Sequence, residues 1–158
     1  MAERSTVHEL DLGGAPSDLA RAARWAAALG EAGVVPRGRL KDVELCLEEA
    51  LANIITHGLA ATAAPRIRLR LSNSAGRLLL EIEDNGAPFD PVRFVPPPRA
   101  RSLEEARPGG SGITLMRQFS DGMGYACKDG LNLLSLSFAP APALDSGVKP
   151  GGSSKPGR

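Results

Sequence analysis

The 158-residue sequence has few aromatic residues, two cysteines, no long hydrophobic run and almost no net charge. Cys46 and Cys127 show neither metal-ligand spacing nor a disulfide framework, so both are expected to be reduced thiols in the core. The formal net charge of +1 predicts no electrostatic attraction to nucleic acid or membranes. Because no apolar run approaches a membrane span and the first residues lack a signal-peptide core, we expect a cytoplasmic protein.

The composition is that of a globular domain, with 42% hydrophobic and 23% charged residues. The length suits one domain with a real core, which we place at residues 1–138. After that point the sequence turns to proline, glycine, serine and lysine. Residues 139–158 are therefore predicted to be a disordered tail.

Hydrophobic periodicity predicts that the chain contains both strands and helices. The predicted strands lie at 6–12, 66–71 and 78–84, around 125, and at 131–138. The predicted helices run from 18 to about 29, from 39 to 58 and from 111 to about 120. In the strand at 66–71 three arginines alternate with apolar residues, which predicts a basic outer face.

The helix predicted at 39–58 organises the rest of the chain. Its apolar stripe repeats at spacings of three and four and consists of Leu40, Val43, Leu47, Ala50, Leu51 and Ile54. Glu49 and Asn53 are one turn apart, so they lie together on the flank of this stripe. A carboxylate beside a carboxamide suits a polarised water and a hard cation, although a solvated helix face is the simpler interpretation.

Two further polar elements lie at the ends of predicted regular structure. Asp84-Asn85-Gly86 ends a strand, and Gly109-Gly110-Ser111-Gly112 begins a helix. A glycine-rich turn at a helix N-terminus offers free backbone N–H groups and the positive end of the helix dipole, which suits phosphate. Taken singly, the first is more often a surface turn and the second a flexible one, and no Walker loop is present.

Together and in this order, the three elements resemble the motifs of the GHKL ATPase/kinase superfamily, and within it the bacterial anti-sigma factor serine/threonine kinases. Residues 48–58, EEALANIITHG, are similar to the N box of that family. Residues 84–91, DNGAPFDP, are similar to its first glycine box. Residues 109–121, GGSGITLMRQFSD, are similar to its second glycine box and the helix that follows. The resemblance extends from about residue 7 to residue 138.

The resemblance implies an α/β (α+β) two-layer sandwich of the Bergerat type, in which helices cover one face of a mixed, mostly antiparallel sheet. It also implies a site for ATP and Mg²⁺. Glu49 would be the base that orients or deprotonates the attacking hydroxyl, and Asn53 would bind Mg²⁺. Asp84 would accept a hydrogen bond from the adenine amino group, and Gly86 would leave room for the ring.

The other positions implied by the resemblance surround the phosphates. They are Gly110, Ser111, Gly112 and Thr114 in the second glycine box, and Arg107 as a lid residue for the terminal phosphate. Arg99 and Arg101 lie in the same proline-rich connection, so the arginine that reaches the γ-phosphate stays open. His57 fits a helix cap as well as the site. Either Asn132 or Ser135 could be the polar residue of a late strand that lines the adenine pocket.

The function implied is that of an ATP-dependent serine/threonine kinase that is also an anti-sigma factor. Such a protein sequesters a sigma factor and phosphorylates an anti-anti-sigma antagonist of the STAS type, and a homodimer is expected. Two alternatives remain open. One is a non-catalytic ATP-binding regulatory module, and the other is a stand-alone domain of the same superfamily with a different signalling partner.

Overall fold

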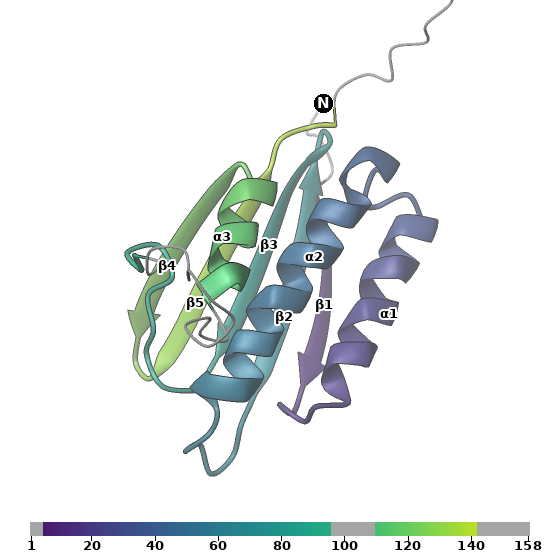
Figure 1. Ribbon diagram of the computed structural model, residues 1–158. Coiled ribbons are helices and arrows are strands. Elements are labelled where there is room, and N and C mark those ends of the chain that lie inside the picture. Colours follow the sequence, from purple (N-terminus) through teal and green to yellow (C-terminus); the bar gives the residue numbers. More distant parts are fainter. Residues whose placement is uncertain (1–4, 96–109, 142–158) are drawn as a thin grey trace, which may run out of the picture.

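The computed structural model describes residues 5–95 and 110–141 of the chain (Figure 1). The predicted helices and strands are confirmed, with shifts of a few residues at their ends. In chain order the elements are β1 (Thr6–Leu12), α1 (Asp18–Glu31), α2 (Arg37–Asn53), η1 (Ile54–Gly58), β2 (Ile67–Ser74), β3 (Arg77–Asp84), α3 (Gly110–Phe119), β4 (Gly122–Lys128) and β5 (Leu131–Phe138).

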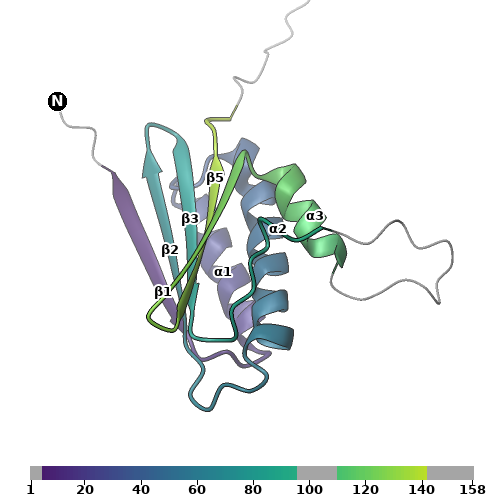
Figure 2. The same ribbon diagram turned by 90° about the vertical axis from the view of Figure 1, so that its left-hand side faces the viewer.

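The strands form one sheet in the order β1-β2-β3-β5-β4. The helices cover one face of it, with α1 on the β1 side, α3 on the β4–β5 side and α2 between them (Figures 1 and 2). The expected two-layer α/β sandwich is thus confirmed. The sheet was expected to be mixed and mostly antiparallel, and each neighbouring pair of described strands is antiparallel.

The alternation in the strands decides which face is buried. In β2, Ile67, Leu69 and Leu71 point into the core, and the arginines between them stay exposed. Burial of each such side chain stabilises the fold by roughly 1.5–3 kcal/mol. The predicted basic outer face is neutralised locally, because Arg68 and Arg70 pair at 2.8 Å with acidic residues of β1. These exposed pairs add little stability.

Helix α2 buries the predicted stripe but ends differently from the prediction. The α-helical part stops at Asn53, and η1 continues it as one π-helical turn in which the N–H of Leu59 donates to the carbonyl of Ile54 at 2.9 Å. A continuous α-helix to Gly58 is therefore wrong in its last turn. Single π-turns are often found at functional sites, and this one brings His57 and Gly58 to the cavity described below.

The two cysteines have different environments. Cys46 is buried, and its thiol contacts the backbone carbonyl of Met116 at 3.9 Å. Burial, together with the nearby carboxylates of Asp42 and Glu49, raises the pKa of Cys46 to about 12, so it stays a neutral thiol. The prediction that Cys127 is also a core thiol is wrong. It is exposed, because β4 is an edge strand of the sheet.

One carboxylate holds the turn between β1 and α1. Asp18 accepts hydrogen bonds from the backbone N–H groups of residues 13–15 at 2.8–3.1 Å, and its second oxygen accepts from Arg21 at 2.8 Å. Burial opposes the charged form, but Arg21 and the three N–H groups outweigh it and lower the pKa of Asp18. The buried carboxylate therefore stays ionised and fixes the entry into α1.

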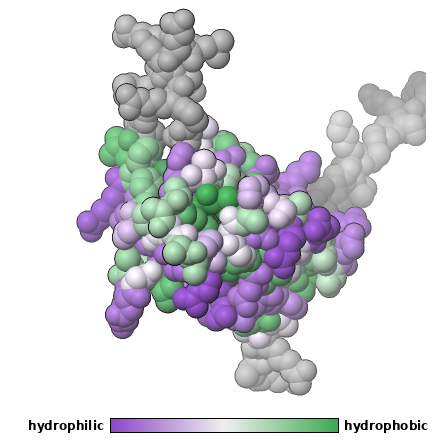
Figure 3. Space-filling model, turned by 90° about the horizontal axis from the view of Figure 1, so that it is seen from below, coloured by the Kyte–Doolittle hydropathy of each residue, from purple (hydrophilic) through white to green (hydrophobic). Residues whose placement is uncertain are grey.

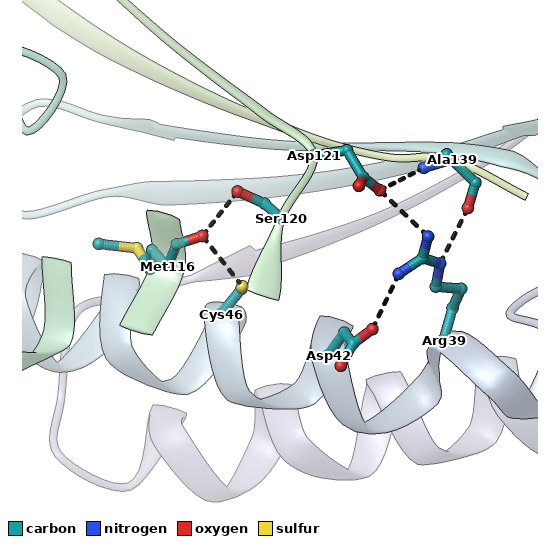
Figure 4. A network of polar contacts seen from close by, with 7 residues as sticks. All are labelled: Arg39, Asp42, Cys46, Met116, Ser120, Asp121 and Ala139. Carbon is teal, nitrogen blue, oxygen red and sulfur yellow. Dashed lines mark hydrogen bonds and ion pairs between the residues drawn. The ribbon is translucent and has the colours of Figure 1, made fainter. Parts of the chain in front are cut away.

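A polar network ties the first turn of α2 to the start of β4 and the end of β5 (Figure 4). Arg39 donates to the carbonyl of Ala139 at 2.9 Å and also binds Asp42 and Asp121, at 3.1 and 3.2 Å. Asp121 accepts the N–H of Ala139 at 2.7 Å. The last strand is thereby anchored to the N-terminal end of α2.

Some predicted features lie outside the described residues. They are Arg99, Arg101, Arg107, Gly109 and the tail from residue 142 onward. Within the ranges that the structure describes, no helix has the length and apolar character needed to cross a membrane.

Candidate functional site

A cavity of about 470 Å³ lies where α2, α3 and the loop after β3 meet. Cavities of roughly 300–1,000 Å³ typically hold small ligands. Figure 3 looks onto the end of the molecule toward which α2 runs, where hydrophobic side chains gather among hydrophilic ones. The lining residues are Ala50, Asn53, Ile54, His57, Gly58, Asp84, Ala87, Phe89, Pro91, Phe94, Val95, Ile113, Met116, Tyr125, Asn132 and Leu134.

One side of the cavity, the strand end, consists of Asp84, Gly86, Tyr125 and Asn132. Asp84 is only 6% exposed, and its Oδ1 accepts from the N–H of Gly86 at 2.8 Å and from Nδ2 of Asn132 at 3.1 Å. The same Nδ2 donates to the carbonyl of Gly86 at 3.0 Å. Each hydrogen bond that the described residues make to Asp84 ends on Oδ1. Oδ2 therefore remains as an acceptor for a ligand.

The structure resolves the choice between two polar residues of β5. Asn132 lies opposite Asp84 in the pairing of β3 with β5, is buried and lines the cavity. Ser135 pairs with Glu81 in the middle of the strand and does not line the cavity. Asn132 is thus the late-strand polar residue of this site.

Tyr125 of β4 completes the strand end and was missed in the sequence. Its hydroxyl donates to Oδ1 of Asn132 at 2.7 Å. Burial, then the adjacent Cys127, raises the pKa of Tyr125, against a smaller opposite effect from the backbone of Phe89. The hydroxyl therefore keeps its proton at neutral pH and remains a donor. In the sequence, Tyr125 is a single tyrosine in a short predicted strand, and that pattern does not indicate which residue it contacts.

Gly86 allows the chain after β3 to approach the end of η1. A Cβ at this position would lie 2.5 Å from the carbonyl oxygen of Gly58 and 3.0 Å from Oδ1 of Asp84. The N–H of Ala87 donates to that same Gly58 carbonyl at 2.8 Å. Glycine is required here because the neighbouring atoms are backbone and cannot move aside.

The helix end, at the first turn of α3, consists of Glu49, Asn53 and Gly112. Asn53 lines the cavity, and Glu49 lies half-buried beside it. A Cβ on Gly112 would lie 2.5 Å from Oε2 of Glu49 and 3.6 Å from Nδ2 of Asn53. The first turn of α3 is therefore packed directly against the predicted pair on α2. Neither Glu49 nor Asn53 forms a hydrogen bond or ion pair with another residue that the structure describes.

Three other predicted site residues lie in α3 and do not line the cavity. Gly110 is the first residue of α3, and Ser111 and Thr114 are exposed on its first turns. His57 does line the cavity, from η1, with its side chain exposed. Arg107 lies outside the described residues.

The loop after β3 forms an apolar wall of the cavity, made by Phe89, Pro91, Phe94 and Val95. The rings of Phe89 and Phe94 are tilted against each other with centroids 5.6 Å apart. Arg117 of α3 holds this wall, since its Nη2 donates to the carbonyls of residues 91, 92 and 94. Sequence reasoning missed Arg117, because a basic residue in the last helical turn usually interacts with its own helix.

No group of three or more His, Cys, Asp or Glu side chains that could hold a metal ion is present within residues 5–95 and 110–141. A metal at the helix end would therefore take most of its ligands from a bound molecule and water. Asn53 could supply a side-chain oxygen. This set suits Mg²⁺, which keeps several waters and commonly binds through substrate phosphates.

Comparison with known proteins agrees with this geometry. Residues 14–138 match the histidine kinase-like ATPase domain family. Over 98 residues the chain is 43% identical to the serine/threonine-protein kinase BtrW of Bordetella bronchiseptica, covering 62% of this chain and 69% of that protein. It is 30% identical over 84 residues to an anti-sigma F factor of Clostridium botulinum, covering 53% of this chain and 59% of the relative.

Among solved structures, the chain resembles the histidine kinase domain of a blue-light-activated histidine kinase from Erythrobacter litoralis. The TM-score is 0.47 and the identity is 18%, with 78% of this chain and 59% of that chain covered.

Proposed function

Because the chain belongs to the histidine kinase-like ATPase domain family, we propose that it is an ATP-dependent serine/threonine kinase that acts as an anti-sigma factor. One observation carries the proposal. One cavity has the buried carboxylate of Asp84 at its strand end, and at its helix end Asn53 lines it with the carboxylate of Glu49 beside that amide. These ends suit the two chemically different ends of ATP, a base with an amino donor and a phosphate chain with its metal.

At the strand end, Asp84 would accept a hydrogen bond from the exocyclic amino group of adenine. Oδ2 is the oxygen that described residues leave without a hydrogen bond, and the side chain borders the cavity. An acceptor buried without a donor costs about 1–3 kcal/mol, so a base that supplies the donor is favoured. The apolar wall at Phe89 and Phe94 would cover the ring.

At the helix end, the N-terminus of α3 would receive the phosphates. The first turn of the helix offers backbone N–H groups, and the lack of a side chain on Gly112 lets this turn pack directly against Glu49. Asn53 would hold Mg²⁺ together with water and phosphate oxygens. The metal would neutralise charge that develops on the phosphate oxygens during transfer.

Glu49 would act as the base. It would accept the proton of a serine or threonine hydroxyl while the hydroxyl oxygen forms a bond to the γ-phosphorus, the bond to the β–γ bridging oxygen breaks, and ADP leaves. Its position next to Gly112 supports this role, because the carboxylate faces the helix terminus at which the phosphates would bind. Phosphoryl transfer depends mainly on such positioning.

The partners follow from the relatives and from the motif resemblance. The names serine/threonine-protein kinase and anti-sigma F factor support a protein that phosphorylates a hydroxyl and binds a sigma factor. The acceptor would be a serine or threonine on a STAS-type anti-anti-sigma protein, which would compete with the sigma factor for a cytoplasmic homodimer.

The test is phosphate transfer from γ-labelled ATP and Mg²⁺ to candidate STAS-type proteins from the same genome. The wild-type protein is compared with Glu49→Ala and with Glu48→Ala, which removes an exposed carboxylate from the neighbouring position of α2. Loss of a general base typically costs about 10²- to 10⁴-fold. We expect Glu49→Ala to lose at least about 100-fold in transfer rate while it still binds ATP, and Glu48→Ala to behave like the wild type.

Two results would contradict the proposal. If no candidate is labelled while ATP binding by calorimetry is normal, the protein is a binding module and not a kinase. If Glu49→Ala transfers phosphate as fast as Glu48→Ala, Glu49 is not the base.

A further inference from the structure

The orientation of the Asn132 side chain is fixed by the chemistry of its neighbours. One end of its amide faces Oδ1 of Asp84 and the carbonyl of Gly86, at 3.1 and 3.0 Å. A carboxylate and a carbonyl only accept hydrogen bonds, so this end must be the NH₂ group. The other end is then the amide oxygen, which requires a donor. The hydroxyl of Tyr125 supplies it at 2.7 Å.

This chain of bonds uses every donor at the strand end. The Tyr125 proton points to Asn132, and the Asn132 NH₂ group points to Asp84 and Gly86. What remains for a ligand are acceptors, the Oδ2 of Asp84 and the lone pairs of the Tyr125 oxygen, and both side chains line the cavity. A base with an amino group at its edge fits such a surface, and a base with a carbonyl oxygen there is repelled.

We propose that Tyr125 is a specificity-determining positioning residue, which acts through Asn132 to make the strand end accept adenine and reject 6-oxopurines. The inference rests on the proposed ATP-binding function. Its physical basis is that a buried amide held by hydrogen bonds at both ends cannot rotate freely. Without the tyrosine hydroxyl, the amide oxygen of Asn132 loses its donor. The amide is then held at its NH₂ end alone, and rotation about χ2 can carry that group away from Asp84 and toward the cavity, where it can donate to a 6-oxo group.

The test compares ATP with ITP, which carries an oxygen in place of the adenine amino group. Calorimetry with Mg²⁺ measures both affinities for the wild type, for Tyr125→Phe and for Ser135→Ala, a control on the strand of Asn132 that lies outside the cavity. Loss of one hydrogen bond typically changes an equilibrium constant about 5- to 10-fold. For Tyr125→Phe we expect the ratio of ATP to ITP affinity to fall by about that factor. Ser135→Ala should keep the wild-type ratio.

A double-mutant cycle tests whether Tyr125 acts through Asn132. In Asn132→Leu no NH₂ group remains to turn toward the base, so adding Tyr125→Phe should leave the ratio of ATP to ITP affinity of that variant unchanged. A purely structural tyrosine would lower the melting temperature of the free protein and leave the ratio unchanged. That result would overturn the inference.

The two proposals fail in different ways. If the wild type binds ATP and Tyr125→Phe keeps its preference, only the role of Tyr125 is wrong. If the wild type binds neither nucleotide, the proposed function and the inference both fall.

Discussion

The two ends of the cavity are built differently. At the strand end, Asp84, Asn132 and Tyr125 are hydrogen-bonded to one another before any ligand binds. At the helix end, Glu49 and Asn53 have no hydrogen bond to other described residues. A site whose groups are already fixed binds without further ordering. The strand end is therefore suited to recognition, and the helix end keeps polar side chains that a ligand could bind.

The largest effect is expected from breaking the strand end with Asp84→Asn. The amide would place a donor against the NH₂ group of Asn132 or against the amino group of adenine. Hydrogen bonds to a charged group contribute about 1.5–3 kcal/mol, so ATP affinity should fall about 10- to 100-fold. Because this end binds no phosphate, the affinity for adenosine should fall by the same factor. A loss confined to ATP, measured by calorimetry, would place Asp84 at the wrong end of the nucleotide.

Two glycine substitutions sharpen the comparison. Gly86→Ala puts a methyl group 2.5 Å from the backbone oxygen of Gly58, which cannot yield, and should cost about 1–3 kcal/mol of stability. Gly112→Ala meets Oε2 of Glu49, the flexible end of a side chain. It should leave the melting temperature nearly unchanged and slow phosphate transfer, because the carboxylate must move.

Thermal unfolding measures the stability of both variants, and the transfer assay measures their rates of phosphate transfer. Equal losses of stability for Gly86→Ala and Gly112→Ala would show that the helix end is as rigid as the strand end.

The smallest effect is expected at the apolar wall, which joins the two ends. Arg117→Ala removes the hydrogen bonds to the carbonyls of residues 91, 92 and 94. Since Arg117 is exposed, we expect little change in stability and a loss of about 3- to 10-fold in ATP affinity. Gln118→Ala is the matched control, exposed at the next position of α3. Equal affinities for the two variants would show that the wall needs no such support.

Local periodicity predicted most of the helices and strands, and the family resemblance supplied the two-layer arrangement. The spacing of Val43, Leu47 and Leu51 predicted the buried side of α2, and the alternation in β2 predicted which face of that strand is buried. The π-helical turn was not predictable, because η1 has the same apolar spacing as an α-helix and differs only in its hydrogen bonds.

The helix end was predictable because Glu49 and Asn53 are neighbours on one helix. At the strand end, the resemblance indicated Asp84 and Gly86, but the choice between Asn132 and Ser135 could not be made, because Asn132 meets Asp84 only when β5 is inserted between β3 and β4. That strand order depends on the whole chain, and no local pattern encodes it. The same holds for Tyr125 and Arg117, whose partners lie in other elements.

The anchor at Arg39 has a practical consequence for experiments. Arg39 holds Ala139 at the N-terminal end of α2, and Asn53 lies at the C-terminal end of the same helix. At 1.5 Å per residue the two positions are roughly 20 Å apart. Pro140 packs against Gly76 in the β2–β3 turn, so the described chain leaves the domain at the pole opposite the cavity. A biotin or fluorophore attached at Ala141, the last described residue of this segment, would therefore be far from the cavity, so nucleotide binding could be followed on a tethered protein.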